Sequence, residues 1–121
     1  MKICITSQGD SLESQIDKKF GRCLYFIIAD SETLEFEAIK NPNLDGMGGV
    51  GVQSGQLMSN KDVKAVLTGN VGPNAFQTLQ AAKIDIITGI SGTVKETIEK
   101  YKTGELKPAE KPSVDSNFGK K

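Results

Sequence analysis

Two short stretches of this chain combine groups that could bind an anion. Residues 20–23 read Phe-Gly-Arg-Cys and place a guanidinium beside a thiol. An arginine on a constrained backbone can form charge-assisted hydrogen bonds to an anion, and a thiol is a soft ligand for iron. Residues 69–74 contain Gly69 and Gly72 and lead into Pro73, where the start of a helix would offer unpaired N–H groups. Each stretch also has a plain structural interpretation, as a solvated basic turn and as an ordinary helix start.

A third stretch, residues 46–51, matches the spacing Gly-x-Gly-x-x-Gly. A dinucleotide-binding fingerprint with this spacing should directly follow the first strand of its unit and have an acidic residue near the end of the next strand. Here a loop with Asn41 and Pro42 intervenes, and the next predicted strand ends at Thr68. We therefore interpret the stretch either as a loop that leads into a helix or as one that closes over a ligand.

The composition excludes several classes of site. The chain has no histidine, so Ser-His and Cys-His catalysis are not possible within it. Fifteen basic and fifteen acidic residues give zero formal charge, so the overall field that would attract nucleic acid or an anionic membrane is missing. No apolar run has the length of a membrane span or the form of a signal peptide, and we expect a cytoplasmic protein.

The two cysteines are far apart and form no CxxC pair, which argues against a disulfide framework or a closed zinc site. Cys4, in the middle of a predicted strand, is interpreted as a core residue. Cys23 keeps two interpretations, as a ligand to iron or as a small apolar residue of the core. The aspartates of the turns, among them Asp17, are interpreted as turn residues and caps rather than as a two-metal nuclease site.

Apolar runs and turn residues predict five strands, at residues 2–7, 23–30, 33–39, 63–68 and 84–88. The second and third should form a hairpin that turns at residues 30–32, with the alternating third strand at the sheet edge. Helices are predicted from residue 50 or 52 to about 60, from Pro73 onward, and from Thr93 to Tyr101, where Thr93 and Glu96 have capping-box spacing. We expect one domain over residues 1–104 and a disordered tail over 105–121.

These elements should bring the three stretches together. Strands joined through helices are expected to be parallel, with right-handed crossovers. A second strand antiparallel to the first would begin where the first one ends. Residues 20–23, 46–51 and 69–74 would then share the edge at the carboxyl ends of the parallel strands, where open α/β sheets bind their ligands.

At residues 20–22, at Asn41 and Pro42, along 46–53 and at 68–76, the chain resembles the dinitrogenase iron-molybdenum cofactor biosynthesis family. The resemblance implies an α/β fold of the ribonuclease-H-like type: a mixed five-stranded sheet, with one antiparallel strand and helices on both faces. It also implies a non-enzymatic protein that transiently binds an anionic iron-sulfur or iron-molybdenum-type cluster. Its partners would be the donor and acceptor proteins of metallocluster transfer in nitrogenase-type cofactor biosynthesis.

Carried over by position, the resemblance implies the cofactor-binding residues Phe20, Gly21, Arg22, Gly48, Gly49, Gly51, Gly69, Asn70, Gly72 and Asn74. To these we add Cys23, which stands where family members usually have alanine. Some members offer histidines near these loops, and because this chain has none, any metal coordination would fall to Cys23. Two other functions stay open. One is a regulatory module that binds a nucleotide or a partner protein through the glycine loops. The other is a phosphoryl-transfer or nuclease enzyme, which the missing strand-interior carboxylates disfavour.

Overall fold

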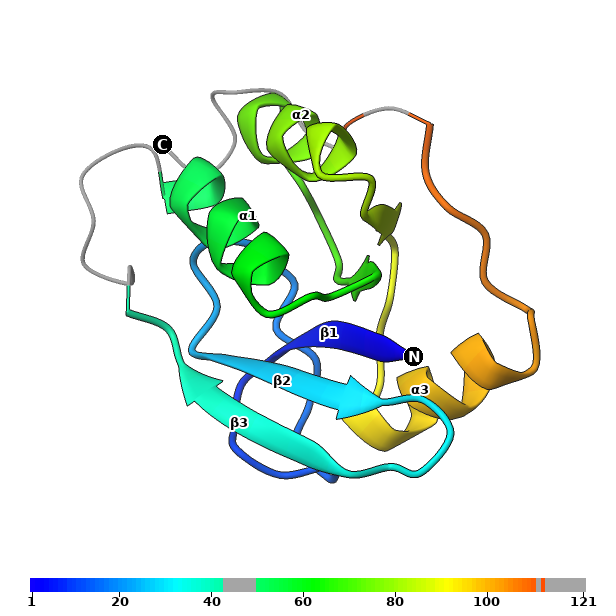
Figure 1. Cartoon of the computed structure of the whole chain (residues 1–121). Coiled ribbons are helices and arrows are strands. Elements are labelled where there is room, and N and C mark those ends of the chain that lie inside the picture. Colours follow the sequence, from blue (N-terminus) through cyan, green and yellow to red (C-terminus); the bar gives the residue numbers. More distant parts are fainter. Residues whose placement is uncertain (43–49, 111, 113–121) are drawn as a thin grey trace.

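Five strands form one mixed sheet in the order β3-β2-β1-β4-β5 (Figure 1). The structure, a computed structural model, describes residues 1–42, 50–110 and 112. The strands are β1 (Lys2–Ser7), β2 (Tyr25–Asp30), β3 (Phe36–Lys40), β4 (Ala65–Leu67) and β5 (Asp85–Ile87), and the helices are α1 (Val50–Asn60), α2 (Pro73–Ala81) and α3 (Val94–Lys102). β2 runs antiparallel to both β1 and β3, whereas β1, β4 and β5 are parallel. The expected fold class and the edge position of the third strand are confirmed.

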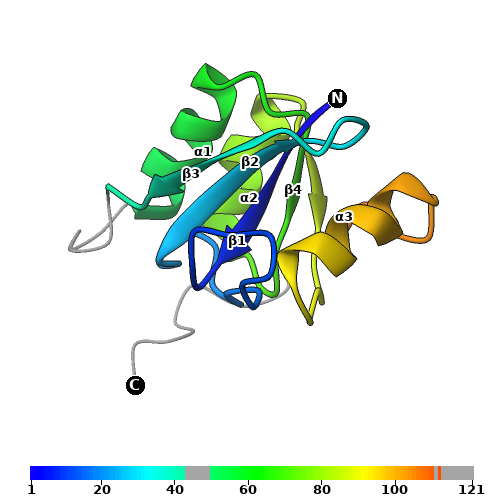
Figure 2. The ribbon, with the colours of Figure 1, turned by 90° about the horizontal axis from the view of Figure 1, so that it is seen from below.

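The sheet is covered on both faces, which explains why its inner strands are almost continuously apolar. Helices α1 and α2 lie on one face and α3 lies on the other (Figure 2). Along β1, Cys4 belongs to the cluster that includes residues of α1 and α2, whereas Ile3 and Ile5 belong to the cluster that includes Val94 and Ile98 of α3. The core is therefore two apolar layers separated by one sheet.

The hairpin is shorter than the sequence predicted. β2 begins at Tyr25, so Cys23 lies in the loop that precedes the strand. The turn after β2 is longer than residues 30–32, because the Asp30 carboxylate accepts hydrogen bonds from the backbone N–H groups of residues 32 and 33. Leu34 has a left-handed φ of 65°, which the extended strand does not allow. β3 consequently begins at Phe36.

The two later helices begin as predicted but differ in how they are capped. At α3 the Thr93 side chain accepts from the Glu96 N–H and the Glu96 carboxylate accepts from the Thr93 N–H, which completes the capping box. α2 begins at Pro73, with Gly72 in the N-cap position and no side-chain hydrogen bond to the helix. None of the helices in the described ranges is long and apolar enough to cross a membrane.

The segment after α3 runs beside the outer edge of β5 (Figure 1). The Ala109 N–H donates to the Ile86 carbonyl at 2.6 Å, and Leu106 packs against the cluster on the α3 face. Leu106 and Ala109 both fall within the stretch 105–121 for which a disordered tail is expected, and that expectation stays a prediction. The rest of the predicted tail, residue 111 and residues 113–121, lies outside the described residues.

Candidate functional site

The turn at residues 18–23 is joined by its backbone to the segment before α2. The Asn70 N–H donates to the Lys18 carbonyl at 2.7 Å, and the Phe20 N–H donates to the Asn70 carbonyl at 3.2 Å. A Cβ at Gly69 would lie 2.7 Å from the Lys18 Cα and 2.8 Å from its carbonyl oxygen, closer than real Cβ atoms approach. Glycine at position 69 is what allows the two segments to approach. The structure thus brings together two of the three stretches that the sequence singled out.

A pair of buried hydroxyls ties this edge to the ends of two strands. Thr6 Oγ1, at the end of β1, lies 2.7 Å from Thr68 Oγ1 and 2.5 Å from the Asp17 carbonyl oxygen. Thr6 is the donor in both contacts, so its one proton is shared between the Asp17 carbonyl and Thr68. Both threonine residues are fully buried. The loop that carries the basic turn is therefore fixed to β1 and β4.

Within the turn, aromatic and cationic side chains face opposite ways. Phe20 is 8% exposed and its ring centroid lies 6.0 Å from that of Phe26 in β2. Gly21 is buried and has a φ of 94°, a conformation that other residues adopt only with strain. Arg22 is exposed. Phe20 therefore anchors the turn in the core, and Gly21 makes the bend that leaves Arg22 at the surface.

Two side chains hold the backbone of this turn. The Asp17 carboxylate accepts from the Lys19 N–H and from the Leu24 N–H, each at 3.2 Å. The Asn41 amide donates to the Gly21 carbonyl at 3.0 Å and to the Cys23 carbonyl at 2.9 Å. Asn41 is 4% exposed, so these two bonds are buried. The Asn41 amide thus fixes the turn from the protein interior, and the partly exposed Asp17 carboxylate fixes it nearer the surface.

Cys23 lies in the apolar core and not at the surface. Its exposed fraction is zero, and it belongs to the same cluster as Cys4 and Phe26. Burial raises the pKa of the Cys23 thiol far above its ordinary value and the Asp17 charge raises it further, although nearby backbone N–H groups oppose the shift. This position favours the core interpretation of Cys23, and its role as a metal ligand stays a prediction.

The N-terminus of α2 lies directly beyond the paired segment. Asn74 is exposed, and Gly72 is half-buried with a φ of −80° and a ψ of 172°. By helix geometry the first N–H groups of α2 have no acceptor inside the helix, and Gly72 has no side chain to provide one. Unlike the N-terminus of α3, the N-terminus of α2 is not capped by a side chain. This helix end favours an anion, and it lies beside the basic turn.

The third stretch falls largely outside the described residues. Gly48 and Gly49 lie outside them, and Gly51 belongs to the first turn of α1. Helices α1 and α2 are in close contact, since a Cβ at Gly55 would lie 2.7 Å from Thr78 Cγ2. Each helix follows a strand that runs parallel to β1, so both N-termini point to the same edge of the sheet.

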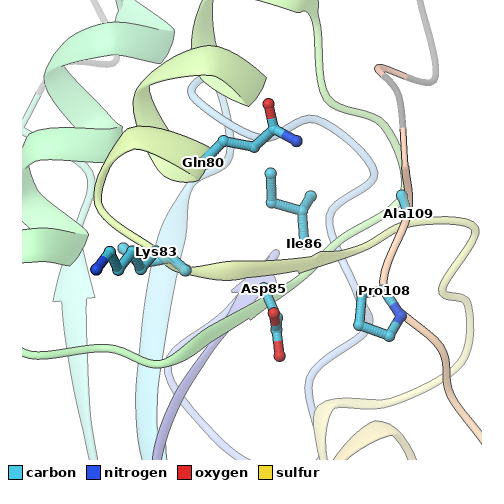
Figure 3. A pocket seen from close by; sticks show the side chains of 7 residues that line it. Gln80, Lys83, Asp85, Ile86, Pro108 and Ala109 are labelled. Carbon is cyan, nitrogen blue, oxygen red and sulfur yellow. The ribbon is translucent and has the colours of Figure 1, made fainter.

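A separate hollow lies beside β5, at the opposite end of α2 (Figure 3). Its volume is about 310 Å³ and it is lined by Gln80, Lys83, Ile84, Asp85, Ile86, Pro108 and Ala109. These residues come from the C-terminal end of α2, from β5 and its approach, and from the segment after α3, away from residues 18–23. In the described part of the chain no three Cys, Asp or Glu side chains are grouped to hold a metal ion.

The sequence did not identify the two side chains that shape the turn. Asp17 was interpreted as a general turn residue, and Asn41 as part of the loop that stops the third strand. The available signal was weak: a polar residue beside Pro42, 20 positions away from the glycine whose carbonyl it binds. Such a distant partner has no local sequence pattern.

Comparison with known proteins adds to this geometry. The family model described as dinitrogenase iron-molybdenum cofactor matches residues 1–104. An uncharacterised protein of Methanocaldococcus jannaschii is 32% identical over 113 residues, covering 91% of this chain and 92% of its own. The apo form of the orange protein from Desulfovibrio gigas superposes with a TM-score of 0.90 at 30% identity, over 93% of this chain and 96% of its own. A NifB-like protein from Thermotoga gives 0.76 at 36% identity, over 88% and 91%.

Proposed function

Since the chain belongs to the dinitrogenase iron-molybdenum cofactor family, we propose that it is a binding protein for an anionic iron-sulfur or related metallocluster precursor. It acts as a carrier, store or accessory factor in metallocofactor biosynthesis and is not itself an enzyme. It receives the cluster from one protein and passes it to another. The observation that carries the proposal is the exposed Arg22, on a turn that is hydrogen-bonded to the segment before the uncapped N-terminus of α2.

The charges around the turn suit an anionic cargo. Lys18, Lys19 and Arg22 are exposed on one short loop of a chain with zero formal charge. The adjacent acid, Asp17, directs both carboxylate oxygens to backbone N–H groups. A cluster at this edge would therefore meet a local positive potential.

Arg22 and the N–H groups of this edge fit the cargo as donors of charge-assisted hydrogen bonds. The buried thiol of Cys23 fits it less directly, because metal ligation requires the thiolate and burial opposes deprotonation. The primary contacts we assign are therefore Arg22 and backbone N–H groups. Ligation by Cys23 requires a rearrangement of the turn and is tested separately.

The proposal is tested on protein purified without oxygen and reconstituted with ferrous iron and sulfide. We expect a visible absorption band and bound iron. Arg22→Ala should weaken cluster retention by about tenfold, the loss of one charge-assisted hydrogen bond. The matched control is Lys64→Ala, which removes an exposed cation at the amino end of β4. Equal retention by both variants would remove Arg22 from the site, and no uptake by wild-type protein would refute the function.

Cys23→Ser separates the two interpretations of the thiol in the same assay. A serine hydroxyl nearly conserves the volume of the side chain but is a poor ligand for iron in a sulfide cluster. Loss of iron and of the absorption band would identify the sulfur as a ligand. Full retention would assign Cys23 to the core.

A further inference from the structure

Almost all backbone N–H groups of the turn interact with a group of the protein itself, with one exception. The N–H groups of Lys19 and Leu24 donate to Asp17, and that of Phe20 donates to the Asn70 carbonyl. Those of Gly21 and Cys23 act on the buried Cys23 thiol and lower its pKa, against the larger effect of burial. In the described part of the chain, the N–H of residue 22 is the one among residues 19–24 with neither a hydrogen-bond acceptor nor an influence on the Cys23 thiol.

Asn41 determines where that N–H points. A trans peptide is planar, so its carbonyl and its N–H point in opposite directions. The carbonyl of the peptide between Gly21 and Arg22 is held by the buried Asn41 amide at 3.0 Å. The N–H of the same peptide therefore points away from Asn41, and it belongs to the residue whose side chain is exposed.

The peptide between Cys23 and Leu24 keeps the turn in this orientation. Between Cys23 and Leu24 the carbonyl is bound by Asn41 at 2.9 Å and the N–H is bound by Asp17 at 3.2 Å. With both ends of this peptide held, the two Asn41 bonds fix the orientation of residues 21–24 as a unit. The left-handed Gly21 supplies the bend that this orientation requires.

We propose that the Arg22 backbone N–H is itself an anion contact, oriented by Asn41 as a positioning residue, so that Arg22 binds one anion through both main chain and side chain. The inference rests on the anion site proposed above and names the class of group it takes: a compact anion with an acceptor atom that both donors can reach. The N–H donor belongs to the main chain and the guanidinium belongs to the side chain. A substitution can therefore remove either contact and leave the other.

The test uses inorganic phosphate as the probe and protein free of iron and sulfide. In amide NMR spectra of the wild-type protein, phosphate should move the Arg22 N–H resonance downfield in a saturable way, more than any other amide of residues 18–24. Arg22→Ala keeps the N–H and should keep this response at higher phosphate concentrations. Asn41→Asp removes both donors at nearly constant shape and should weaken phosphate binding by about tenfold and abolish the response of residue 22.

Each outcome decides the inference. An Arg22 amide that stays still while the Arg22 or Lys19 side chain responds would overturn the main-chain contact, and this wild-type result stands even if Asn41→Asp does not fold. Unchanged phosphate affinity in a folded Asn41→Asp protein would overturn the positioning role. Because no metal is present, failure here is distinct from failure of cluster reconstitution, and phosphate binding without cluster uptake would keep the anion contact while refuting the metallocluster function.

Discussion

The approach of Gly69 to the turn leads to a prediction that a pair of similar substitutions can test. In Gly69→Ala the new Cβ would lie 2.7 Å from the Lys18 Cα, 2.8 Å from its Cβ and 2.8 Å from its carbonyl oxygen. Two of these three atoms are backbone, so the clash cannot be relieved by a side-chain rotation. Forcing a methyl group into a packed site costs about 1–3 kcal/mol. At this chain length that corresponds to a fall in Tm of roughly 3–12 °C.

Gly72→Ala is the matched control, only three residues away. A Cβ there meets no atom within 4 Å, and the backbone conformation is one that alanine adopts readily. Alanine allows the unfolded chain fewer conformations than glycine does, and this stabilises the folded protein by about 0.4–1 kcal/mol. Alanine is a poorer N-cap than glycine and loses about the same amount, so the net change in the free energy of unfolding should be close to zero.

Urea unfolding and thermal melts of the two variants measure the difference directly. Gly69→Ala should also weaken the two hydrogen bonds that Asn70 makes with residues 18 and 20, so its loss of stability should be accompanied by faster amide exchange at Asn70 and Phe20. If both variants melt within about 2 °C of the wild-type protein, which is about 0.5 kcal/mol, then the close approach does not hold the turn and the site geometry argued above is wrong.

Three further predictions concern the turn, the thiols and α3. Asp17→Ala should lower the free energy of unfolding by about 1–2 kcal/mol, because two backbone N–H groups lose their acceptor; urea unfolding equal to wild type would contradict this. Cys4 and Cys23, whose pKa values are raised by burial, should react with a disulfide reagent at pH 8 only as the protein unfolds, and reaction of the native protein at the rate of a free thiol would contradict it. Hydrogen bonds from Thr93 lower the pKa of Glu96, so its stabilisation is present above the unfolded pKa of about 4.3 and lost as pH falls through the folded value. The free energies of unfolding of Glu96→Gln and wild type, measured in urea, should therefore differ at pH 7 and converge near pH 3, which lies well below the unfolded pKa. A difference that stays constant with pH would refute the capping role.

The sequence predicted the elements that depend on local chemistry. Pro73 and the Thr93–Glu96 pair marked the starts of two helices, because a proline ring and a capping side chain act within a few residues of their own position. The direction of each strand followed from the connections between them, and this placed residues 20–23 and 69–74 at one edge before any contact was known. Strand limits were less accurate, since the turn after β2 depends on bonds from the Asp30 carboxylate.

The features that sequence could not supply are those set by partners distant in the chain. Asn41 is a loop residue by local pattern, and its role appears only when β3 returns it beneath Gly21 and Cys23. Cys23 was open to two interpretations by sequence, as an iron ligand or as a core residue, and its side chain lies in the core. Ala109 follows a stretch rich in charged residues, and only the open edge of β5 explains its hydrogen bond to Ile86.

The division of the site into exposed cations and fixed backbone donors has a consequence for how a cargo would be held. Attraction by Lys18, Lys19 and Arg22 acts through solvent and is screened over about 8 Å at physiological salt. A backbone N–H that is already oriented by Asn41 acts at contact distance, and little conformational entropy is lost when an anion binds it. At the proposed site the cations would therefore govern how quickly an anion arrives, and the oriented turn would govern how long it stays. The proposed carrier function would require both properties to be separately adjustable, because such a protein must capture a cluster and still release it to the next protein.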